Sequence, residues 1–206
     1  MFITFEGTEG SGKSFQTRSL VQRLRENGFT VLATKEPGGT PLGTELRRLL
    51  LDREELQIGA RAEALLMNAC RAQLVETVIR PALERGEVVV CDRFADSTLA
   101  YQGAGRGLNQ QDLGSVISFA TAGLQPDMTM LLDVPVEVGL ARKHAQDERN
   151  RFEAEAVAFH TRVRSAYQAF ALAEPGRWRC FDATQSADRL SEAIWGAVVE
   201  RMGIHQ

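Results

Sequence analysis

The fold of this 206-residue chain is decided by the stretch Gly7-Thr8-Glu9-Gly10-Ser11-Gly12-Lys13-Ser14. The stretch fits the pattern GxxxxGK[ST] at every fixed position, and it lies between an apolar run, Phe2 to Phe5, and a helical pattern from about Lys13 to Asn27. Glycines here let backbone N–H groups converge on phosphate oxygens, and the following helix adds partial positive charge at its start. The alternative, a glycine-rich turn with a chance lysine, leaves this complete pattern in its proper setting unexplained.

The pattern assigns chemistry to individual residues of this phosphate-binding loop. All eight residues are expected to contact ATP; Lys13 should reach its β- and γ-phosphates, and the Ser14 hydroxyl should ligate Mg²⁺ as the metal cofactor. The loop alone does not fix the reaction, because GTPases, ATPases, transporters and kinases all use it. The chain has no convincing NKxD guanine-reading motif, which argues against a GTPase.

Short apolar runs alternate with long amphipathic segments along the whole chain. The runs predict strands at Phe2–Phe5, Thr30–Thr34, Glu87–Cys91, Met128–Val134 and, more weakly, Arg179–Asp182. Helical patterns cover Ala60–Arg85, Gln110–Ala122, Phe152–Ala173 and Ala187–Met202. Apolar strands separated by helices predict an α/β fold with a five-stranded parallel sheet flanked by helices. We expect one domain over residues 1–206, since no linker or internal repeat interrupts the alternation.

The composition excludes several classes of partner. The chain is 44% hydrophobic and 25% charged, with a net charge of −3, so no overall field favours nucleic acid or an anionic membrane. No apolar run approaches the ~20 residues that a membrane helix needs. Its three cysteines, Cys70, Cys91 and Cys180, form no CxxC pair, which favours a reducing, cytoplasmic location.

Three further clusters follow predicted strands. The first is Lys35-Glu36-Pro37-Gly38-Gly39-Thr40, with Arg47 later; the second is Cys91-Asp92-Arg93-Phe94, continuing to Gly103; the third is the charged segment Arg142–Arg151. The carboxyl ends of parallel strands are where α/β sheets bind ligands. A phosphorylated acceptor is an anion, and a guanidinium can hold it bidentately. The clusters therefore predict a second anion site beside the loop.

Together with FEGTEGSGKS, these motifs resemble the bacterial group of thymidylate kinases over almost the whole chain. The resemblance implies the P-loop NTPase and nucleoside-monophosphate-kinase fold, and transfer of a phosphoryl group from MgATP to dTMP, giving dTDP for dTTP biosynthesis. It implies small-molecule substrates, ATP and dTMP, with no nucleic acid or membrane partner, and a homodimer. The apolar helical faces near Ala60–Val78 and Gln110–Ala122 could form the dimer interface or belong to the core.

The resemblance also implies roles for residues around the acceptor phosphate. Arg93 and Arg47 correspond to arginines that contact it, Glu9 to an acidic loop residue near the phosphate and sugar, and Asp92 to a Walker B-like acid that holds Mg²⁺ through water. Two of these residues also have a structural reading: Arg93 as a surface ion pair, and Asp92 as a helix N-cap. Arg48, beside Arg47, should face solvent.

Other residues are implied to read the acceptor nucleoside. Arg71 resembles the arginine that bonds the pyrimidine carbonyl; Thr98 and Gln102 fall at base-reading positions, and Tyr101 at the position that crowds a ribose 2′-hydroxyl. Glu36 and Pro37 belong to the EPGGT motif of the same site. Two residues depart from the family pattern. Met67 replaces the usual phenylalanine that stacks on thymine, and Phe15 replaces a hydroxyl residue that touches the α-phosphate.

The charged segment is implied to be a lid over about residues 142–152. Thr8, Glu9 and Ser11 bring no positive charge to the phosphate-binding loop, whereas the segment carries several basic residues. This placement matches the lid-arginine subgroup of the family, with Arg151 as first choice for the arginine over the transferring phosphate and Arg149 as second. The segment could instead be a solvated charge run.

Two rival functions stay open at this point. One is a kinase for another deoxynucleotide or a deoxynucleoside, which would carry similar loop and DR motifs. The other is a nucleotide-binding regulator without catalysis, which predicts a broken loop or missing acceptor arginines. Here both the loop and the arginines are intact.

Overall fold

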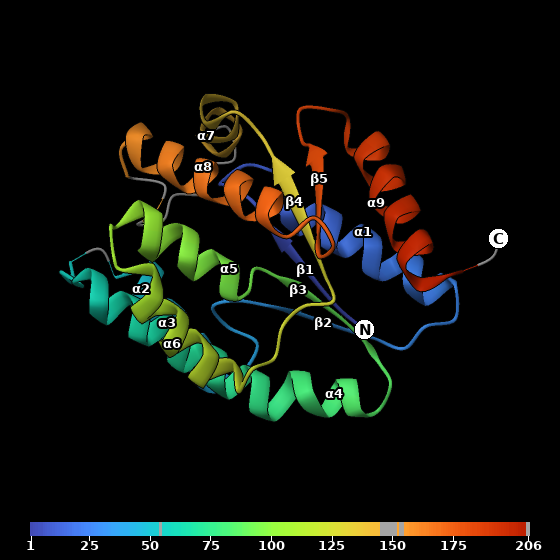
Figure 1. Cartoon of the computed structure of the whole chain (residues 1–206), viewed down its shortest axis with the longest axis horizontal. Helices are drawn as coiled ribbons and strands as arrows, with labels where there is room; N and C mark the ends of the chain where they lie inside the picture. Colours follow the sequence, from blue (N-terminus) through green and yellow to red (C-terminus); the bar gives the residue numbers. More distant parts are fainter. Residues whose placement is uncertain (54, 145–151, 153–154, 205–206) are drawn as a thin grey trace.

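Five parallel strands form one sheet in the computed structural model, which describes residues 1–53, 55–144, 152 and 155–204. Their order across the sheet is β2-β3-β1-β4-β5 (Figure 1). The strands are β1 (Phe2–Glu6), β2 (Val31–Lys35), β3 (Val88–Asp92), β4 (Met128–Asp133) and β5 (Trp178–Asp182). The predicted five-stranded parallel sheet is therefore confirmed, including the weakest strand.

Helices fill the connections between the strands. The helical elements are α1 (Lys13–Glu26), α2 (Pro41–Leu51), α3 (Ala60–Leu74), η1 (Val75–Ile79), α4 (Arg80–Glu84), α5 (Ala95–Thr98), η2 (Leu99–Gly105), α6 (Gln110–Thr121), α7 (Val136–His144), α8 (Val157–Ala173) and α9 (Ala187–Met202). The elements η1 and η2 are π-helical. The single helical run predicted over Ala60–Arg85 corresponds to α3, η1 and α4 in succession. Among the described helices, none is both long and apolar enough to cross a membrane.

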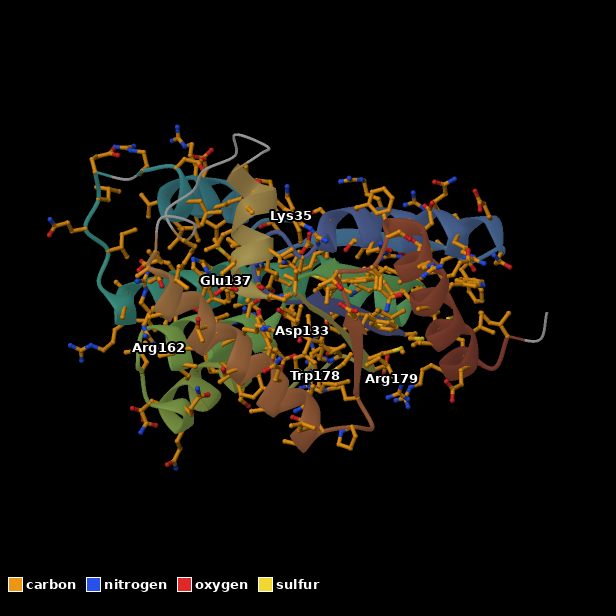
Figure 2. The ribbon with its side chains drawn as sticks, turned by 90° about the horizontal axis from the view of Figure 1, so that it is seen from above. Lys35, Asp133, Glu137, Arg162, Trp178 and Arg179 are labelled. Atoms are coloured by element: carbon orange, nitrogen blue, oxygen red, sulfur yellow. The ribbon has the colours of Figure 1, made fainter. Side chains whose placement is uncertain are left out.

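The sheet is covered on both faces because its side chains alternate. Ile3 and Phe5 of β1 pack into a core with α1 and α9, whereas Phe2 packs on the opposite face with η1 and α4. On that opposite face, beside β4 and β5, α8 and η2 close a third core around Tyr167 and Trp178. Figures 1 and 2 show α1 and α8 on opposite sides of the sheet. The near-continuous burial of β1, β3 and β4 follows from this double covering.

Two boundaries differ from the sequence prediction. The helix expected from Phe152 begins at Val157, because Ala156 adopts an extended conformation (φ −62°, ψ 150°) at its N-cap. Phe152 instead packs edge-on against Tyr101, with ring centroids 5.6 Å apart. At the other end of the charged segment, Arg142 and Lys143 lie within α7, so the stretch expected to form a lid starts inside a helix.

Every strand ends in a charged residue at the same edge of the sheet. These residues are Glu6, Lys35, Asp92, Asp133 and Asp182. Lys35 and Asp133 are labelled in Figure 2, where they end β2 and β4. Since all strands are parallel, this carboxyl edge gathers the polar groups and the loops that follow them. The candidate site is built on it.

Candidate active site

The loop between β1 and α1 depends on glycines at three left-handed positions. Gly7, Gly10 and Gly12 have φ values of 142°, 68° and 86°. A Cβ on Gly10 would lie 1.9 Å from the carbonyl oxygen of Gly139 in α7, and a Cβ on Gly7 would lie 2.5 Å from that of Leu132. The loop is therefore pressed against α7 and the end of β4, in a shape that side chains at these positions would prevent.

Lys13 lies buried against the loop. Its Nζ donates hydrogen bonds to the carbonyl oxygens of Gly7 (3.0 Å) and Thr8 (2.8 Å) and to Oγ of Ser11 (3.2 Å). Burial and the neighbouring charge of Arg93 lower the pKa of Lys13 to about 8. The ammonium group thus lies directly against the backbone of the glycine-rich loop.

Ser14 and Asp92 meet next to the loop. The Ser14 hydroxyl donates to Oδ2 of Asp92 at 2.8 Å, which brings together the first turn of α1 and the end of β3. The described residues contain no group of three or more His, Cys, Asp or Glu side chains that could hold a metal by themselves. A pair of oxygen ligands fits Mg²⁺, which usually binds one or two protein ligands together with phosphates and waters.

Arg93 joins the loop to the second sheet-edge motif. It is a non-glycine residue in the left-handed region (φ 70°), a conformation that costs free energy unless the surroundings fix it. Its Nη2 donates to Oε1 of Glu9 (2.8 Å) and to the Tyr101 hydroxyl (3.0 Å), and its Nη1 donates to the Gly7 carbonyl (3.1 Å). The guanidinium is therefore held beside the phosphate-binding loop, with its side chain 16% exposed.

Glu9 and Tyr101 complete this cluster. The Tyr101 hydroxyl donates to Oε1 of Glu9 at 2.9 Å. Burial alone would raise the pKa of Glu9, but the charges of Arg93 and Lys13 outweigh it and lower that pKa to about 2. Burial raises the pKa of Tyr101 well above its ordinary value, so the phenol stays neutral. Glu9 is thus a carboxylate and Tyr101 a hydrogen-bond donor at neutral pH.

Glu6, which was not predicted from the sequence, holds the backbone next to Arg93 in place. This fully buried carboxylate accepts hydrogen bonds from the Phe94 amide (2.8 Å), the Ser97 hydroxyl (2.6 Å) and the Tyr167 hydroxyl (2.8 Å). Burial, followed by the charge of Asp96, raises the pKa of Glu6 to about 7. Its sequence signal was an acid that continues an otherwise apolar strand, FITFE. Glu6 fixes the backbone immediately after Arg93.

A second cluster surrounds Arg71 in α3. This guanidinium is 2% exposed and forms an ion pair with Glu36, with Nη2 2.7 Å and Nε 2.9 Å from Oε2. It also donates to Oδ1 of Asn68 (2.8 Å), Oγ1 of Thr98 (3.1 Å) and the Phe94 carbonyl (3.1 Å). Burial raises the pKa of Glu36 despite this partner. Oε1 of Glu36 accepts no hydrogen bond within the described part of the chain.

The remaining acceptor residues lie around that cluster. The Nε2 atom of Gln102 donates to Oε1 of Glu63 at 2.9 Å, Met67 is half-buried, and Arg47 donates to the Pro37 carbonyl at 3.0 Å. Arg48 is exposed and pairs with Glu45, as its helix position predicted. The stretch 93–102 links the two clusters, because Arg93 and Tyr101 face the loop whereas Thr98 contacts Arg71.

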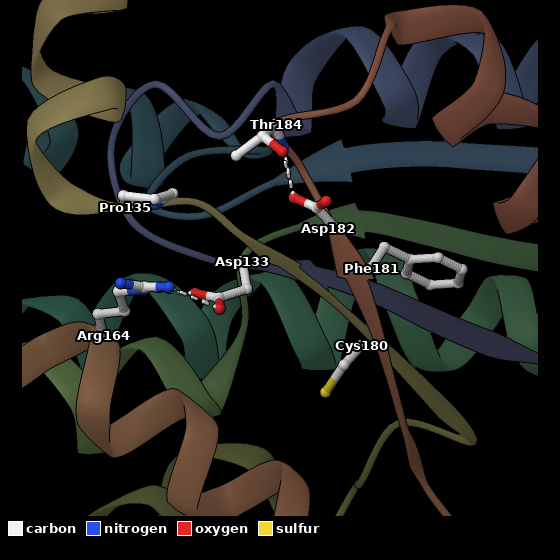
Figure 3. Close-up of a pocket in the computed structure, with 7 residues that line it drawn as sticks. All are labelled: Asp133, Pro135, Arg164, Cys180, Phe181, Asp182 and Thr184. Atoms are coloured by element: carbon white, nitrogen blue, oxygen red, sulfur yellow. Dashed lines mark hydrogen bonds and ion pairs between the residues drawn. The ribbon is translucent and has the colours of Figure 1, made fainter.

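A hollow of about 270 Å³ opens at the carboxyl ends of β4 and β5 (Figure 3). Asp133, bonded by both its oxygens to Arg164, lies across from Asp182 and Thr184 in that view. Next to it, Nη1 of Arg142 donates to the Ala183 carbonyl at 2.8 Å. Arg142 thus connects α7 with the loop after β5.

Two of the residues predicted from the sequence are not described by the structure, and a third, Phe15, faces solvent. Arg149 and Arg151 lie outside the described residues. Phe15 is 47% exposed in the first turn of α1. The other candidate residues lie along one edge of the sheet, where a buried lysine, two arginines, several carboxylates and the amides of a glycine loop come together. Such an arrangement can hold two phosphorylated ligands end to end.

Comparison with known proteins agrees with this geometry. The family model described as Thymidylate kinase matches residues 5–194. The chain is 54% identical over 202 residues to a thymidylate kinase of Thermomicrobium roseum, covering 98% of this chain and 95% of that one. It is 50% identical over 201 residues to a thymidylate kinase of Deinococcus radiodurans, covering 98% and 97%. The crystal structure of thymidylate kinase from Ehrlichia chaffeensis superposes with a TM-score of 0.79 and 30% identity, covering 96% of this chain and 97% of that one.

Proposed function

The chain belongs to the thymidylate kinase family, whose members transfer a phosphoryl group from ATP to dTMP, and we propose that it does so at the carboxyl edge of its sheet. The observation that carries this assignment is the contact of Arg93 with both Glu9 and Tyr101 beside the phosphate-binding loop. This contact joins a donor loop to an acceptor motif. The family match supports neither of the two rival functions that the sequence left open.

The donor end is supported by the loop itself. The backbone amides of Gly7 to Ser14 and the ammonium of Lys13 bind the β- and γ-phosphates of ATP. Ser14 and Asp92 would hold Mg²⁺, which, when bound, neutralises charge on the phosphate oxygens. The adenosine end lies near the loop from Asp182 to Gln185, beside Arg142.

The acceptor end is supported by the arginines. Arg93, with Arg47, holds the phosphate of dTMP, because a guanidinium can donate two parallel hydrogen bonds to it. With a pKa of about 2, Glu9 stays charged, so it orients Arg93 and the sugar rather than donating a proton. Glu36, Pro37, Met67, Arg71, Thr98 and Gln102 surround the base. Tyr101 crowds the 2′ position of the sugar, which favours a deoxyribonucleotide.

The transfer needs little further chemistry from the protein. The acceptor phosphate is already anionic at neutral pH, so the enzyme positions the two ligands in line and neutralises the charge that spreads over the transferring group. Arg151, with Arg149 as second choice, remains our sequence prediction for a lid arginine over that group.

We further infer a homodimer. Phe119 of α6 is 88% exposed and Leu65 of α3 is 58% exposed, and both lie on helical stretches that the sequence suggested as an interface. The two helices pack against each other, and Figure 1 shows α3 and α6 side by side. Large apolar side chains in such positions are typical of a surface that another protein chain covers.

The experiment is ADP release with MgATP against dTMP, dUMP, dCMP, dGMP, UMP and thymidine. Strong turnover with dTMP and weak turnover with UMP would support both the acceptor and the role of Tyr101. Turnover with thymidine or another monophosphate, but not with dTMP, would overturn the acceptor assignment. Binding of ATP without turnover of any acceptor would favour a regulator instead.

A further inference from the structure

Two helical faces meet at the base end of the acceptor site. Residues spaced by four lie on each: Glu63, Met67 and Arg71 on α3, and Thr98 at the end of α5, Gln102 in η2 and Arg106 directly after η2. Side-chain contacts of three residue pairs join these faces, and one of the three is the ion pair between Arg106 and Glu63. Arg71 donates to Thr98 at 3.1 Å, and Gln102 donates to Glu63 at 2.9 Å.

Glu63 is a wholly buried carboxylate, at 0% exposure, with Gln102 beside it at 2%. Arg106 supplies its counter-charge, with Nε and Nη2 each 3.3 Å from a carboxylate oxygen. A carboxylate can only accept hydrogen bonds, whereas an amide donates from its nitrogen and accepts at its oxygen. The NH₂ end of Gln102 must therefore face Glu63, which fixes the orientation of the amide.

Because the amide nitrogen of Gln102 faces Glu63, its amide oxygen, Oε1, faces away from Glu63. None of the described residues donates a hydrogen bond to Oε1 of Gln102. This oxygen is also not one of their fully buried side-chain atoms that lack a hydrogen-bond partner. Arg71 adds no free donor here, because its N–H groups already donate to Glu36, Asn68, Thr98 and the Phe94 carbonyl. The site thus presents an acceptor, Oε1 of Gln102. Thymine and uracil match this acceptor, because their N3 atom carries a donor N–H. Cytosine does not, because its N3 atom is itself an acceptor.

We propose that Glu63 is a specificity-determining residue, which locks the amide of Gln102 so that the site accepts 4-oxo pyrimidines and rejects 4-amino pyrimidines. This inference rests on the proposed acceptor site. Glu63 does not touch the base; it acts through Gln102. An unpaired or mispaired buried hydrogen-bonding group is costly, so fixing one amide can reject a base strongly.

The test is the substitution Glu63→Gln, assayed by kcat/KM with dTMP, dUMP and dCMP. A glutamine at residue 63 can bond either end of the Gln102 amide, so the lock is lost. The dTMP:dCMP ratio should fall by roughly tenfold or more, whereas the dTMP:dUMP ratio should not change, because those bases differ only in the 5-methyl group. Glu155→Gln is the matched control, since Glu155 pairs with Arg106 but makes no contact with Gln102 among the described hydrogen bonds.

A second variant guards against misfolding of the first. Gln102→Met removes the amide at similar volume and should lower the dTMP:dCMP ratio as Glu63→Gln does, and the double variant should lower it no further. An unchanged ratio in either single variant, or an equal loss with all three substrates, would overturn the proposal. Wild-type turnover of dTMP, measured first, tests the proposed function separately.

Discussion

Arg93 is the residue on which both ends of the site converge. Its guanidinium meets Glu9 and Tyr101 from a left-handed backbone position that Glu6 supports through the Phe94 amide. This preorganisation matters because charge stabilisation by a fixed group requires no rearrangement during the reaction. The structure shows one side chain in contact with both the phosphate-binding loop and Tyr101, and under the proposed function the same side chain holds the acceptor phosphate.

Replacing Arg93 by lysine should reduce kcat with dTMP by about 10²- to 10³-fold, because one ammonium cannot reproduce the bidentate contacts of a guanidinium. Steady-state kinetics with varied dTMP checks this. Arg48→Lys is the control, since Arg48 lies on the surface with a side chain 64% exposed, and its activity should match wild type. An Arg93→Lys enzyme within about threefold of wild type would contradict the role given to Arg93.

Glu6 should make the stability of the protein depend on pH. Its pKa is about 7 in the folded protein against an ordinary 4.5, so the folded state binds the proton more tightly than the unfolded chain. The resulting stabilisation is fully present below about pH 4.5 and is lost as the pH rises through 7. Glu6→Gln cannot titrate at this position.

Urea unfolding of both proteins at pH 5 and pH 8 checks this. The free energy of unfolding of wild type minus that of Glu6→Gln should fall by roughly 2 to 3 kcal/mol between the two pH values. The two proteins share all other titrating groups, so the contributions of these groups to the free energy of unfolding cancel in the difference. A pH-independent difference would show that the carboxyl group of Glu6 keeps an ordinary pKa.

At the scale of elements, the phosphate-binding loop is shaped by α7 as much as by its own glycines. A Cβ on Gly139 would lie 2.3 Å from the Glu9 carbonyl oxygen. Gly139→Ala should therefore push the loop out of position and raise KM for ATP by about tenfold or more, since a small misplacement of a binding element is costly.

The matched control is Gly196→Ala in α9, where an added Cβ meets nothing within 4 Å. That change should leave KM for ATP unaltered and raise the free energy of unfolding by about 0.5–1 kcal/mol, because alanine is the better helix former. The two variants separate a general effect of removing glycine from a steric effect on the loop. Equal KM values for ATP in the two variants would show that α7 does not shape the phosphate-binding loop.

The sheet and the loop could be predicted from the sequence because their signals are local. Apolar runs give the strands, and GxxxxGKS gives the turn into α1. Glu6 and Glu63 could not be predicted in this way. Phe94, Ser97 and Tyr167 lie 88, 91 and 161 residues from Glu6, and Gln102 and Arg106 lie 39 and 43 residues from Glu63, so their roles exist only once the elements are assembled. The late start of α8 escaped prediction because Phe152 continues the helical pattern but packs on Tyr101 instead.

At the scale of the whole molecule, the exposed apolar side chains on α3 and α6 should determine the oligomeric state. Phe119→Asp places a charge at the most exposed of these positions and should convert a dimer into monomers, as measured by light scattering after size exclusion. Leu172→Asp is the control, because Leu172 is 83% exposed on α8, away from that surface. Dissociation by Leu172→Asp but not by Phe119→Asp would place the interface on α8.

The most direct test of the central claim follows the γ-phosphoryl group of labelled ATP and separates the products after a single incubation with the wild-type enzyme. Direct transfer at the sheet edge predicts that label appears in dTDP only when dTMP is present, and that Lys13→Ala and Arg93→Ala both abolish it. Label released as inorganic phosphate, or held covalently on the protein, would contradict a direct transfer from ATP to dTMP at this site.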